Sequence, residues 1–309
     1  MYCDWILVAF LSVNLCWGLT PVEFGQFKSR SFVESNSGLQ GSVQINGTVM
    51  STFSIFSNGI PDHKTGTASS KIKVQSYHIK LPTSPSVGTT TTCLPIGPVG
   101  MAINGVPIFN SYSHDCCDTG KKELGSFDNC WGLVDDLGRY HYSTAPLCLL
   151  KLVCNDPSGL IGVAFDGFPI YGPNDETGRR VSKTDLDECN GRFDRYRKYR
   201  YHVTTEFPYT IGCFKGIPIP GYGGACACNQ LATPCPNQQP PGPSHPPTRR
   251  KRSVASGSSY GNMTALECCS SAATCDHLYH SKSSAEQPLN HVHYFTTLFV
   301  SLTTIFMFV

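Results

Sequence analysis

Charged residues and long apolar stretches are both scarce in this chain of 309 residues. Only 15% of the residues are charged and the formal net charge is +2, so nothing implies a broad electrostatic partner or nucleic-acid binding. No long window keeps a 3.6-residue apolar period, which predicts that helix is a minor component. The chain also lacks a Gly-x-Ser-x-Gly nucleophile elbow, a phosphate-binding glycine loop and paired Cys-x-x-Cys zinc knuckles. The 29 glycines and 22 prolines instead favour a turn-rich, β-rich fold.

Cysteine, by contrast, is abundant. The 16 cysteines argue for an oxidising compartment, where disulfides form and persist. Cys3 and Cys16 lie near the N-terminus, and the remaining even number suits a disulfide framework. A metal–thiolate protein is the rival interpretation, but Cys226-Ala-Cys228 is too closely spaced for the usual zinc site.

Both ends of the chain resemble targeting signals. The apolar run Trp5–Leu15 is too short for a membrane span and is followed by Gly18, which suits a signal-peptidase cut; a buried N-terminal strand is the alternative. The apolar, uncharged C-terminus follows a polar spacer and the small residues Ser283 and Ser284. That arrangement predicts attachment of a glycosylphosphatidylinositol (GPI) anchor, with a tail-anchoring helix as the alternative.

Between these signals the sequence predicts further processing. Asn46 and Asn262 head glycosylation sequons. A proline-rich linker ends in a basic run that predicts proteolytic cleavage after Arg252. Eleven mature cysteines precede that site and three follow it, so a disulfide would tether the two products. The expected segments are a signal peptide (1–18), an N-terminal β-rich segment (19–98), a duplicated core (99–214), the linker (215–252), a membrane-proximal segment (253–284) and the GPI-attachment signal (285–309).

The core contains an internal duplication. The pattern Asp-x-Cys-x-Gly-x-x-Asp followed by Tyr-x-Tyr begins at Asp128 and recurs 59 residues later at Asp187. Upstream, Val99–Phe109 resembles Ile161–Tyr171, so we expect two equivalent units, 99–143 and 161–202. Their Asn-Gly and Asp-Gly pairs predict type I′ hairpins, and their prolines predict positions at a sheet edge.

Several motifs occur in the order that is typical of the YHYH domain family, which residues 55–214 resemble. They are Ser57-Asn-Gly-Ile-Pro-Asp-His63, Asn104-Gly-Val-Pro-Ile-Phe-Asn110, Tyr140-His-Tyr-Ser143, Gly162-Val-Ala-Phe-Asp-Gly-Phe-Pro-Ile-Tyr171 and Leu186-Asp-Glu-Cys-Asn-Gly191. The family is widespread in secreted and surface proteins and carries no settled activity, so the resemblance implies fold and location only. This chain departs from the family pattern at Ser143, which replaces the second histidine, and at Leu133, which replaces the histidine of a Gly-His pair.

The duplication raises the hypothesis of a metal site. If the two Tyr-x-Tyr strands pair antiparallel with Tyr142 opposite Tyr201, His141 lies opposite His202, and two facing imidazoles can ligate one divalent metal ion. The alternative is that the tyrosines fill a core while the polar residues face solvent. The aspartates that would complete the metal shell are Asp128, Asp135, Asp187 and Asp194.

The repeated Asp-x-Cys-x-Gly loops have a simpler interpretation, an Asx turn stapled by a disulfide, which we favour over a Ca²⁺ loop. Symmetry suggests the pairs Cys130–Cys148 and Cys189–Cys213, although sequence alone leaves connectivity open. The remaining histidines that we considered as ligands, His63, His78 and His114, are interpreted as turn or surface residues.

Taken together, the sequence predicts an all-β, internally duplicated and disulfide-stapled protein. We expect a non-catalytic surface interaction or ligand-binding protein, held on the outer leaflet of the plasma membrane by a lipid anchor. Its partner would be an extracellular ligand rather than nucleic acid. The alternative function is a metal-binding domain or a metal-dependent extracellular enzyme that uses His141, His202 and the nearby aspartates.

Overall fold

The computed structural model describes residues 18–47, 53–66, 71–123, 125–153 and 155–223, with Cys226, Cys228 and the backbone of two short strands near the N-terminus. All of them belong to one compact unit. Within the predicted signal peptide, β1 (Trp5–Val8) pairs antiparallel with β2 (Leu11–Asn14). No helix in these described ranges is long and apolar enough to cross a membrane.

Most of the predicted processing sites fall elsewhere in the chain. Arg252, Asn262, Ser283 and Ser284 lie outside the described residues, so the linker cleavage, the second sequon and the lipid anchor stay predictions. Asn46, which heads the first sequon, is described and exposed at the end of a strand.

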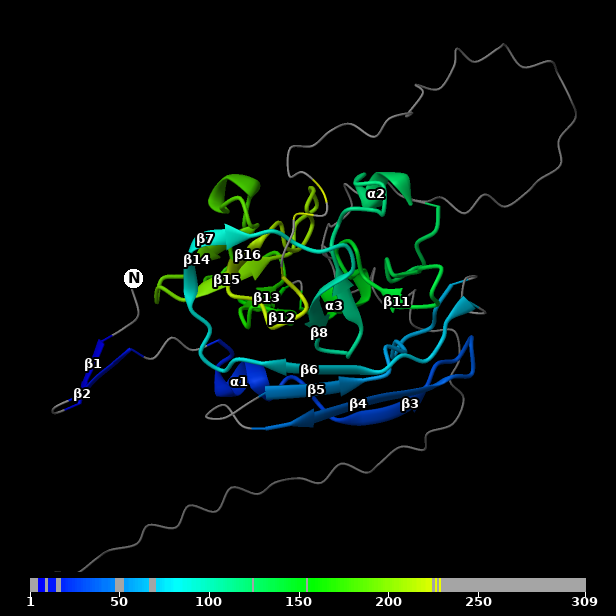
Figure 1. Cartoon of the computed structure of the whole chain (residues 1–309), viewed down its shortest axis with the longest axis horizontal. Helices are drawn as coiled ribbons and strands as arrows, with labels where there is room; N and C mark the ends of the chain where they lie inside the picture. The colour runs from blue at the N-terminus through cyan, green and yellow to red at the C-terminus, as the bar shows by residue number, and fades with distance from the viewer. Residues whose placement is uncertain are drawn as a thin grey trace, which may run out of the picture. The chain divides into compact units, whose positions relative to one another are not determined.

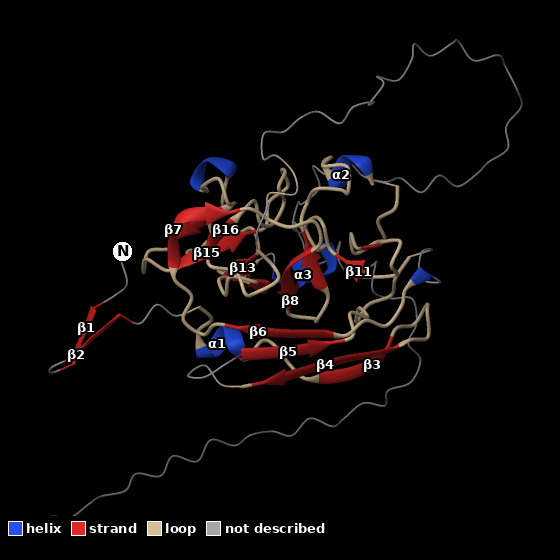
Figure 2. Cartoon of the chain, viewed as in Figure 1, coloured by secondary structure: helices blue, strands red, loops and turns tan. Residues whose placement is uncertain are grey.

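An N-terminal antiparallel sheet with the strand order β3-β4-β5-β6 forms one layer of the fold (Figures 1 and 2). Its elements are α1 (Pro21–Phe24), β3 (Arg30–Val33), β4 (Gln40–Asn46), β5 (Phe53–Ser57) and β6 (Tyr77–Leu81). Alternation buries Ile55 and Ile79 while Lys80 faces solvent. The strand β6 begins at Tyr77, and the residues before it belong to a long connection between β5 and β6.

The duplicated core forms a six-stranded sheet with the order β14-β15-β13-β12-β8-β9. Its strands are β8 (Pro98–Ala102), β9 (Pro107–Phe109), β12 (Leu160–Ala164), β13 (Pro169–Tyr171), β14 (Gly191–Phe193) and β15 (Tyr199–His202). Smaller elements surround it: β7 (Val87–Thr92) paired with β16 (Phe214–Gly216), β10 (Leu133–Val134) paired with β11 (Tyr140–His141), α2 (Thr119–Lys122), α3 (Leu147–Val153) and the 3₁₀ turn η2 (Lys183–Asp185). The strand-rich, duplicated and disulfide-stapled fold class is therefore confirmed.

The two repeats meet through equivalent strands. β8 and β12 pair antiparallel, and the register places Met101 opposite Val163. These two residues are 62 positions apart, which is also the offset between Val99–Phe109 and Ile161–Tyr171. A pseudo-twofold axis therefore passes through the Met101–Val163 pair and relates one repeat to the other.

The tyrosine strands obey the same symmetry. Tyr142 forms a parallel bridge to Ile108 of β9, and Tyr201 pairs in parallel with Ile170 of β13. The hypothesis that the two tyrosine strands pair with each other is therefore wrong. Each strand instead docks on the hairpin of its own repeat, because the strands that meet at the axis are β8 and β12.

The hairpin turns also differ from the prediction. Type I′ requires positive φ at both central residues, whereas here Gly105 and Gly167 have φ values of 80° and 90° and the preceding residues do not. In the first hairpin, Gly105 N donates to Ala102 O at 2.9 Å. The resulting turns leave Asn104 and Asp166 with ordinary φ values and buried side chains.

The two hairpin prolines occupy different environments. Pro107 lies in β9, the terminal strand of the sheet, as predicted. Pro169 does not lie at an edge, because β13 is between β12 and β15. Pro169 is tolerated there as the first residue of its strand, since the parallel pairing with β15 begins only at Ile170.

One apolar core joins the N-terminal sheet to the duplicated sheet. It includes Phe53 and Leu81 from the first layer and Met101, Val163 and Phe165 from the second. Among residues described at both ends, four disulfides staple the fold: Cys93–Cys226, Cys116–Cys228, Cys130–Cys148 and Cys189–Cys213.

Candidate functional site

The duplicated Asp-x-Cys-x-Gly motif organises a loop around one carboxylate. In the first repeat, Asp128 Oδ1 accepts hydrogen bonds from Cys130 N at 2.9 Å and Gly132 N at 3.0 Å. Asp128 Oδ2 accepts the Tyr140 hydroxyl at 2.7 Å. Gly132 is required because a Cβ at that position would lie 2.0 Å from the tyrosine oxygen. The motif therefore holds the tyrosine strand against its loop.

The second repeat repeats this geometry. Asp187 Oδ1 accepts from Cys189 N and Gly191 N at 3.0 and 3.1 Å, and the Tyr199 hydroxyl donates to the same carboxylate at 3.0 Å. A Cβ on Gly191 would lie 2.1 Å from the Tyr199 oxygen. The interpretation as Asx turns stapled by disulfides is confirmed, and the disulfides are the two pairs that symmetry suggested.

The other two aspartates proposed as metal ligands close hairpin turns. Asp135 Oδ1 accepts from Leu137 N and Arg139 N, and Asp194 Oδ1 accepts from Tyr196 N and Lys198 N. Each remaining carboxylate oxygen faces an arginine of its own hairpin, Arg139 and Arg200 respectively. Hydrogen bonds and ion pairs within each hairpin therefore engage both carboxylates.

The two histidines of the metal hypothesis lie on separate strands, His141 on β11 and His202 on β15. His141 stacks on Phe109 with ring centroids 3.9 Å apart, and its Nδ1 lies 3.0 Å from Arg139 O. His202 Nδ1 lies 2.9 Å from Gly172 O. Burial lowers the pKa of each imidazole to about 4, so both are neutral at physiological pH.

The six residues do not assemble into a metal site. The strand pairing on which the hypothesis depended is absent, as shown above. Among the described residues, the one group whose donor atoms have ligand-like spacing is Glu188, Cys189 and Cys213, and the two cysteines are joined in a disulfide. The alternative interpretation placed the tyrosines in a core and the polar residues beside them in solvent. The first part is confirmed, because the tyrosines of both strands belong to the buried core. The second part is wrong, because His141, Ser143, Arg200 and His202 are all buried.

A different polar cluster lies where the first repeat meets the N-terminal sheet. Asn104 Nδ2 donates to the Tyr142 hydroxyl at 3.0 Å and to Asp62 Oδ1 at 2.9 Å. His63 Nε2 lies 2.8 Å from the same hydroxyl, and Arg30 forms an ion pair with Asp62 at 3.0 Å. We call these five residues the His63 cluster.

The His63 cluster is buried at its base and open at its rim. Tyr142 and Asn104 are 0% and 1% exposed, whereas the side chains of Arg30 and Asp62 are 32% and 29% exposed. His63 is half-buried. The cluster therefore presents one imidazole, one guanidinium and one carboxylate to solvent on a rigid base.

Protonation in the His63 cluster follows from its geometry. Burial holds the pKa of Tyr142 well above its usual value, so the phenol keeps its proton. If the hydroxyl accepts from Asn104 and donates to His63 Nε2, the imidazole proton lies on Nδ1. His63 Nδ1 lies 3.5 Å from Lys64 O, too far for a strong hydrogen bond, so this edge can donate to a ligand.

The second repeat has an equivalent cluster with a different cover. Tyr201 corresponds to Tyr142, and its hydroxyl donates to Asp166 Oδ2 at 2.5 Å. Backbone amides of Lys215 and Gly216 close the site by donating to the Tyr201 hydroxyl and to Asp166. Burial raises the pKa of Asp166 to about 6, against the opposing effect of its hydrogen bonds. We call these four residues the Asp166 cluster; its phenol and carboxylate are fully enclosed.

His63 was not predicted as a site residue from the sequence. It was interpreted as a turn or surface residue, although it ends one of the motifs that carried the family resemblance. His63 and Tyr142 are 79 residues apart, and a contact between residues so distant in the sequence cannot be predicted from a local pattern. The available signal was that the motif ending at His63 and the motif beginning at Asn104 both belong to the family resemblance. Asn104 was interpreted only as a turn residue.

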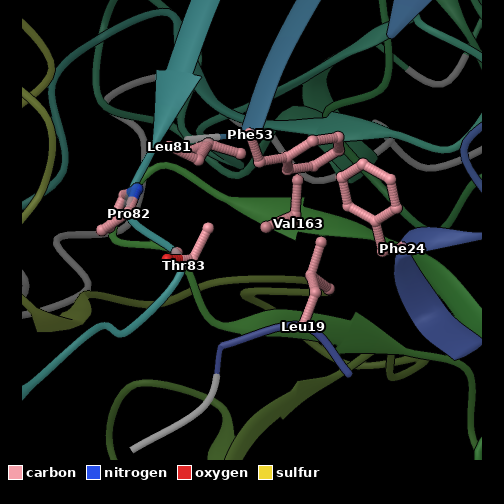
Figure 3. A pocket seen from close by; sticks show the side chains of 8 residues that line it. Leu19, Phe24, Phe53, Leu81, Pro82, Thr83 and Val163 are labelled. Atoms are coloured by element: carbon pink, nitrogen blue, oxygen red, sulfur yellow. The ribbon is translucent and has the colours of Figure 1, made fainter. Parts of the chain in front are cut away.

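A small apolar pocket lies elsewhere, between the N-terminal segment and the two sheets. Figure 3 shows Leu19, Phe24 and Phe53 pointing toward one another beside Val163. The pocket is lined mainly by apolar side chains, and Thr83 is the polar side chain among them. We interpret it as a packing defect between layers rather than a ligand site.

Comparison with known proteins identifies a family for part of the chain. Residues 78–180 match the model of a family described as YHYH protein. No curated protein and no solved structure matches the chain. The matched region runs from β6 through the first repeat and past β13, and thus includes Asn104, Tyr142 and the strands at the pseudo-twofold axis. The family resemblance is therefore confirmed over residues 78–180, which match the YHYH protein family, whereas the motifs Ser57–His63 and Leu186–Gly191 lie outside the match.

Proposed function

We propose that this protein is an extracellular, lipid-anchored binding protein that presents the His63 cluster to a ligand and performs no catalysis. The four disulfides support an oxidising compartment. The predicted leader and GPI-attachment signal support export and retention at the outer face of the plasma membrane.

The observation that carries the binding role is the composition of the His63 cluster. It contains a fixed imidazole and a neutral phenol, but no serine, cysteine or lysine lies within its network as a nucleophile. The nearby Ser57 hydroxyl donates to Gly105 O at 2.6 Å and is buried. Donors and acceptors held on a rigid base favour recognition over chemistry.

The charges of the cluster indicate the ligand class. Arg30 and Asp62 form an ion pair, so their charges cancel and a neutral ligand is favoured. The rim nevertheless offers donors on Arg30 and His63 beside acceptors on Asp62. Adjacent donors and acceptors match neighbouring hydroxyl groups, so we propose a neutral saccharide as the ligand.

An array of neutral oligosaccharides tests this role, probed with the fluorescently labelled full chain extracted from membranes in detergent. We expect His63→Ala and Asp62→Asn to reduce binding at least tenfold, the effect of losing about 1.4 kcal/mol. His78→Ala is the matched control, because His78 is an exposed histidine on β6 outside the cluster. Undiminished binding by His63→Ala would contradict the proposal.

The anchor is tested separately. Phosphatidylinositol-specific phospholipase C should release the protein from intact cells into the medium. Retention on the cells after treatment would contradict a GPI anchor and favour the tail-anchoring helix, without bearing on the ligand.

A further inference from the structure

The two equivalent hairpins of the repeats carry opposite charge. Residues 191–202 contain five Arg or Lys and one Asp, a net charge of 5 − 1 = +4. The equivalent residues 132–143 contain one Arg and two Asp, a net charge of 1 − 2 = −1. The backbones correspond, because Phe193 pairs with Tyr199 as Val134 pairs with Tyr140. The charge is therefore a property of the second hairpin and not of the fold.

Arg200 and Arg192 lie on the strands of the hairpin and form ion pairs. Arg200 forms a buried ion pair with Asp194 and also donates to Ser158 Oγ. Arg192 pairs with Glu176 at 2.8 Å. The Asp194 side chain is 1% exposed, so the one acidic residue of the hairpin contributes little to its outer surface.

The remaining cations gather at the exposed tip of the hairpin. Arg195 and Arg197 are exposed and Lys198 is half-buried. The ion pairs found among described residues leave Arg195 and Lys198 without a carboxylate partner. Arg197 has a φ of 61° where the first repeat has Gly138 at 82°, so an arginine stands in a backbone conformation that favours glycine.

Aromatic rings lie between these cations. Phe193 and Tyr196 are 46% and 55% exposed. The Arg195 guanidinium lies 4.7 Å above the Tyr196 ring and donates to its hydroxyl at 2.7 Å. β14 is the terminal strand of the six-stranded sheet, so no further strand of that sheet pairs with its outer edge.

We propose that the tip of the β14–β15 hairpin binds a sulfated polysaccharide through Arg195, Arg197 and Lys198, with Phe193 and Tyr196 packing against its sugar rings. Guanidinium and ammonium groups pair with sulfate oxygens, and aromatic faces suit the apolar faces of sugar rings. Basic clusters of this size are typical of heparin-binding patches.

The choice of a glycan rests on the proposed extracellular location. Nucleic acid and the anionic lipids of the cytoplasmic leaflet would both be on the wrong side of the membrane. The overall formal charge is only +2, so attraction to polyanions would be local to this tip rather than a property of the whole surface.

The internal duplication supplies a conservative test variant. Arg195→Asp, Tyr196→Leu and Arg197→Gly together place the tip sequence of the first repeat, Asp136-Leu-Gly138, onto the second. Because the first repeat folds with that sequence, the triple variant should fold, which its thermal unfolding curve checks. Lys80→Asp with Lys28→Ser is the control: it makes the same charge change of −3 at exposed residues of the N-terminal region.

The measurement is binding of the full chain in detergent to immobilised heparan sulfate over a range of salt concentrations. We expect the tip variant to lose at least tenfold in affinity and to show a weaker salt dependence, while the control variant stays within twofold of the wild type. Chemically desulfated heparan sulfate should not bind. Equal loss in both variants, or binding that does not depend on sulfate, would overturn the proposal.

Two further probes separate other polyanions. Tighter binding to single-stranded RNA or to phosphatidylserine vesicles than to heparan sulfate would overturn the assignment to a glycan. Weaker binding to both supports it. Because all of these assays use purified protein, they can succeed even if the anchor or the saccharide-binding role of the His63 cluster fails, and His63→Ala should leave heparan sulfate binding unchanged.

Discussion

The His63 and Asp166 clusters occupy equivalent places in the two repeats but are covered by different segments and differ in their exposure to solvent. Each is built on a buried tyrosine, Tyr142 or Tyr201, that reaches the residue before the hairpin glycine. In the first repeat that residue is Asn104, and the cover is the side chain of His63 with solvent beyond it. In the second it is Asp166, and the cover is the backbone of β16.

The difference shows where this domain diversifies. The duplicated strands, disulfides and Asx turns are nearly interchangeable between the repeats. The segments that cover the two clusters come from outside the repeats, namely the long connection after β5 and the strand β16. A partly exposed cluster and a fully enclosed one thus arise on the same scaffold, because different flanking segments fold over it.

The largest expected effects test the part that the repeats share. Gly132→Ala and Gly191→Ala should each destabilise the protein by about 4 kcal/mol, because the new methyl group displaces a buried tyrosine and breaks its hydrogen bond. Chemical denaturation measures the loss. Gly25→Ala is the control, since its Cβ would meet nothing closer than 3.4 Å. A loss below about 1 kcal/mol in either repeat would mean that the Asp–Gly–Tyr unit is not rigid.

Acidification should come next in size. The pKa values of His141 and His202 are lowered from 6.5 to about 4 in the folded state. The unfolded chain therefore binds protons first, and their contribution to stability is lost as the pH falls from 6.5 toward 4. Asp166 acts in the opposite direction, because its raised pKa of about 6 makes the folded state bind the proton first.

The two histidines outweigh the one aspartate. We expect a net loss of about 3 kcal/mol between about pH 7 and about pH 4.5, measured by urea unfolding at each pH. Asp166→Asn removes the opposing group and should steepen the loss. A stability that is flat or rising on acidification would show that these imidazoles are not buried as described.

The smallest expected effect is the difference in stability cost between removing the tyrosine hydroxyl of the Asp166 cluster and removing that of the His63 cluster. Tyr201→Phe should cost about 2 to 3 kcal/mol, because it leaves the enclosed Asp166 without its hydroxyl donor and Lys215 N without its acceptor. Tyr142→Phe should cost about 1 kcal/mol, because Asn104 still reaches Asp62 and His63 can turn to water. Thermal unfolding of both variants measures the contrast. Equal costs would remove the distinction between a closed cluster and an open one.

The sequence predicted features that depend on local pattern or on repetition. The 59-residue offset located both Asp-Cys-Gly-Tyr units, and symmetry suggested two disulfides that the structure contains. The strand content and the hairpins at Gly105 and Gly167 also follow from local composition, although the turn type does not. Residue patterns alone were enough for these features, because each is decided within a few positions of the chain.

Contacts between distant segments were not predictable in this way. Strand order decided that Tyr142 and Tyr201 dock on their own hairpins, and no property of the tyrosine strands themselves specifies that choice. The burial of Arg200 and His202 follows from the position of β15 between two other strands. The role of His63 depends on a connection that folds back over a turn 41 residues further along the chain, at Asn104.

The pairing of Met101 with Val163 has a consequence for the ancestry and divisibility of the domain. Two identical copies of a single unit could have associated through that same strand edge as separate polypeptides, before fusion into one gene joined them. Cutting the present chain between β11 and β12 would leave two half-domains joined by the disulfides Cys93–Cys226 and Cys116–Cys228. Expressed separately, each half would have an open strand edge and should aggregate, so the smallest piece worth expressing is the pair.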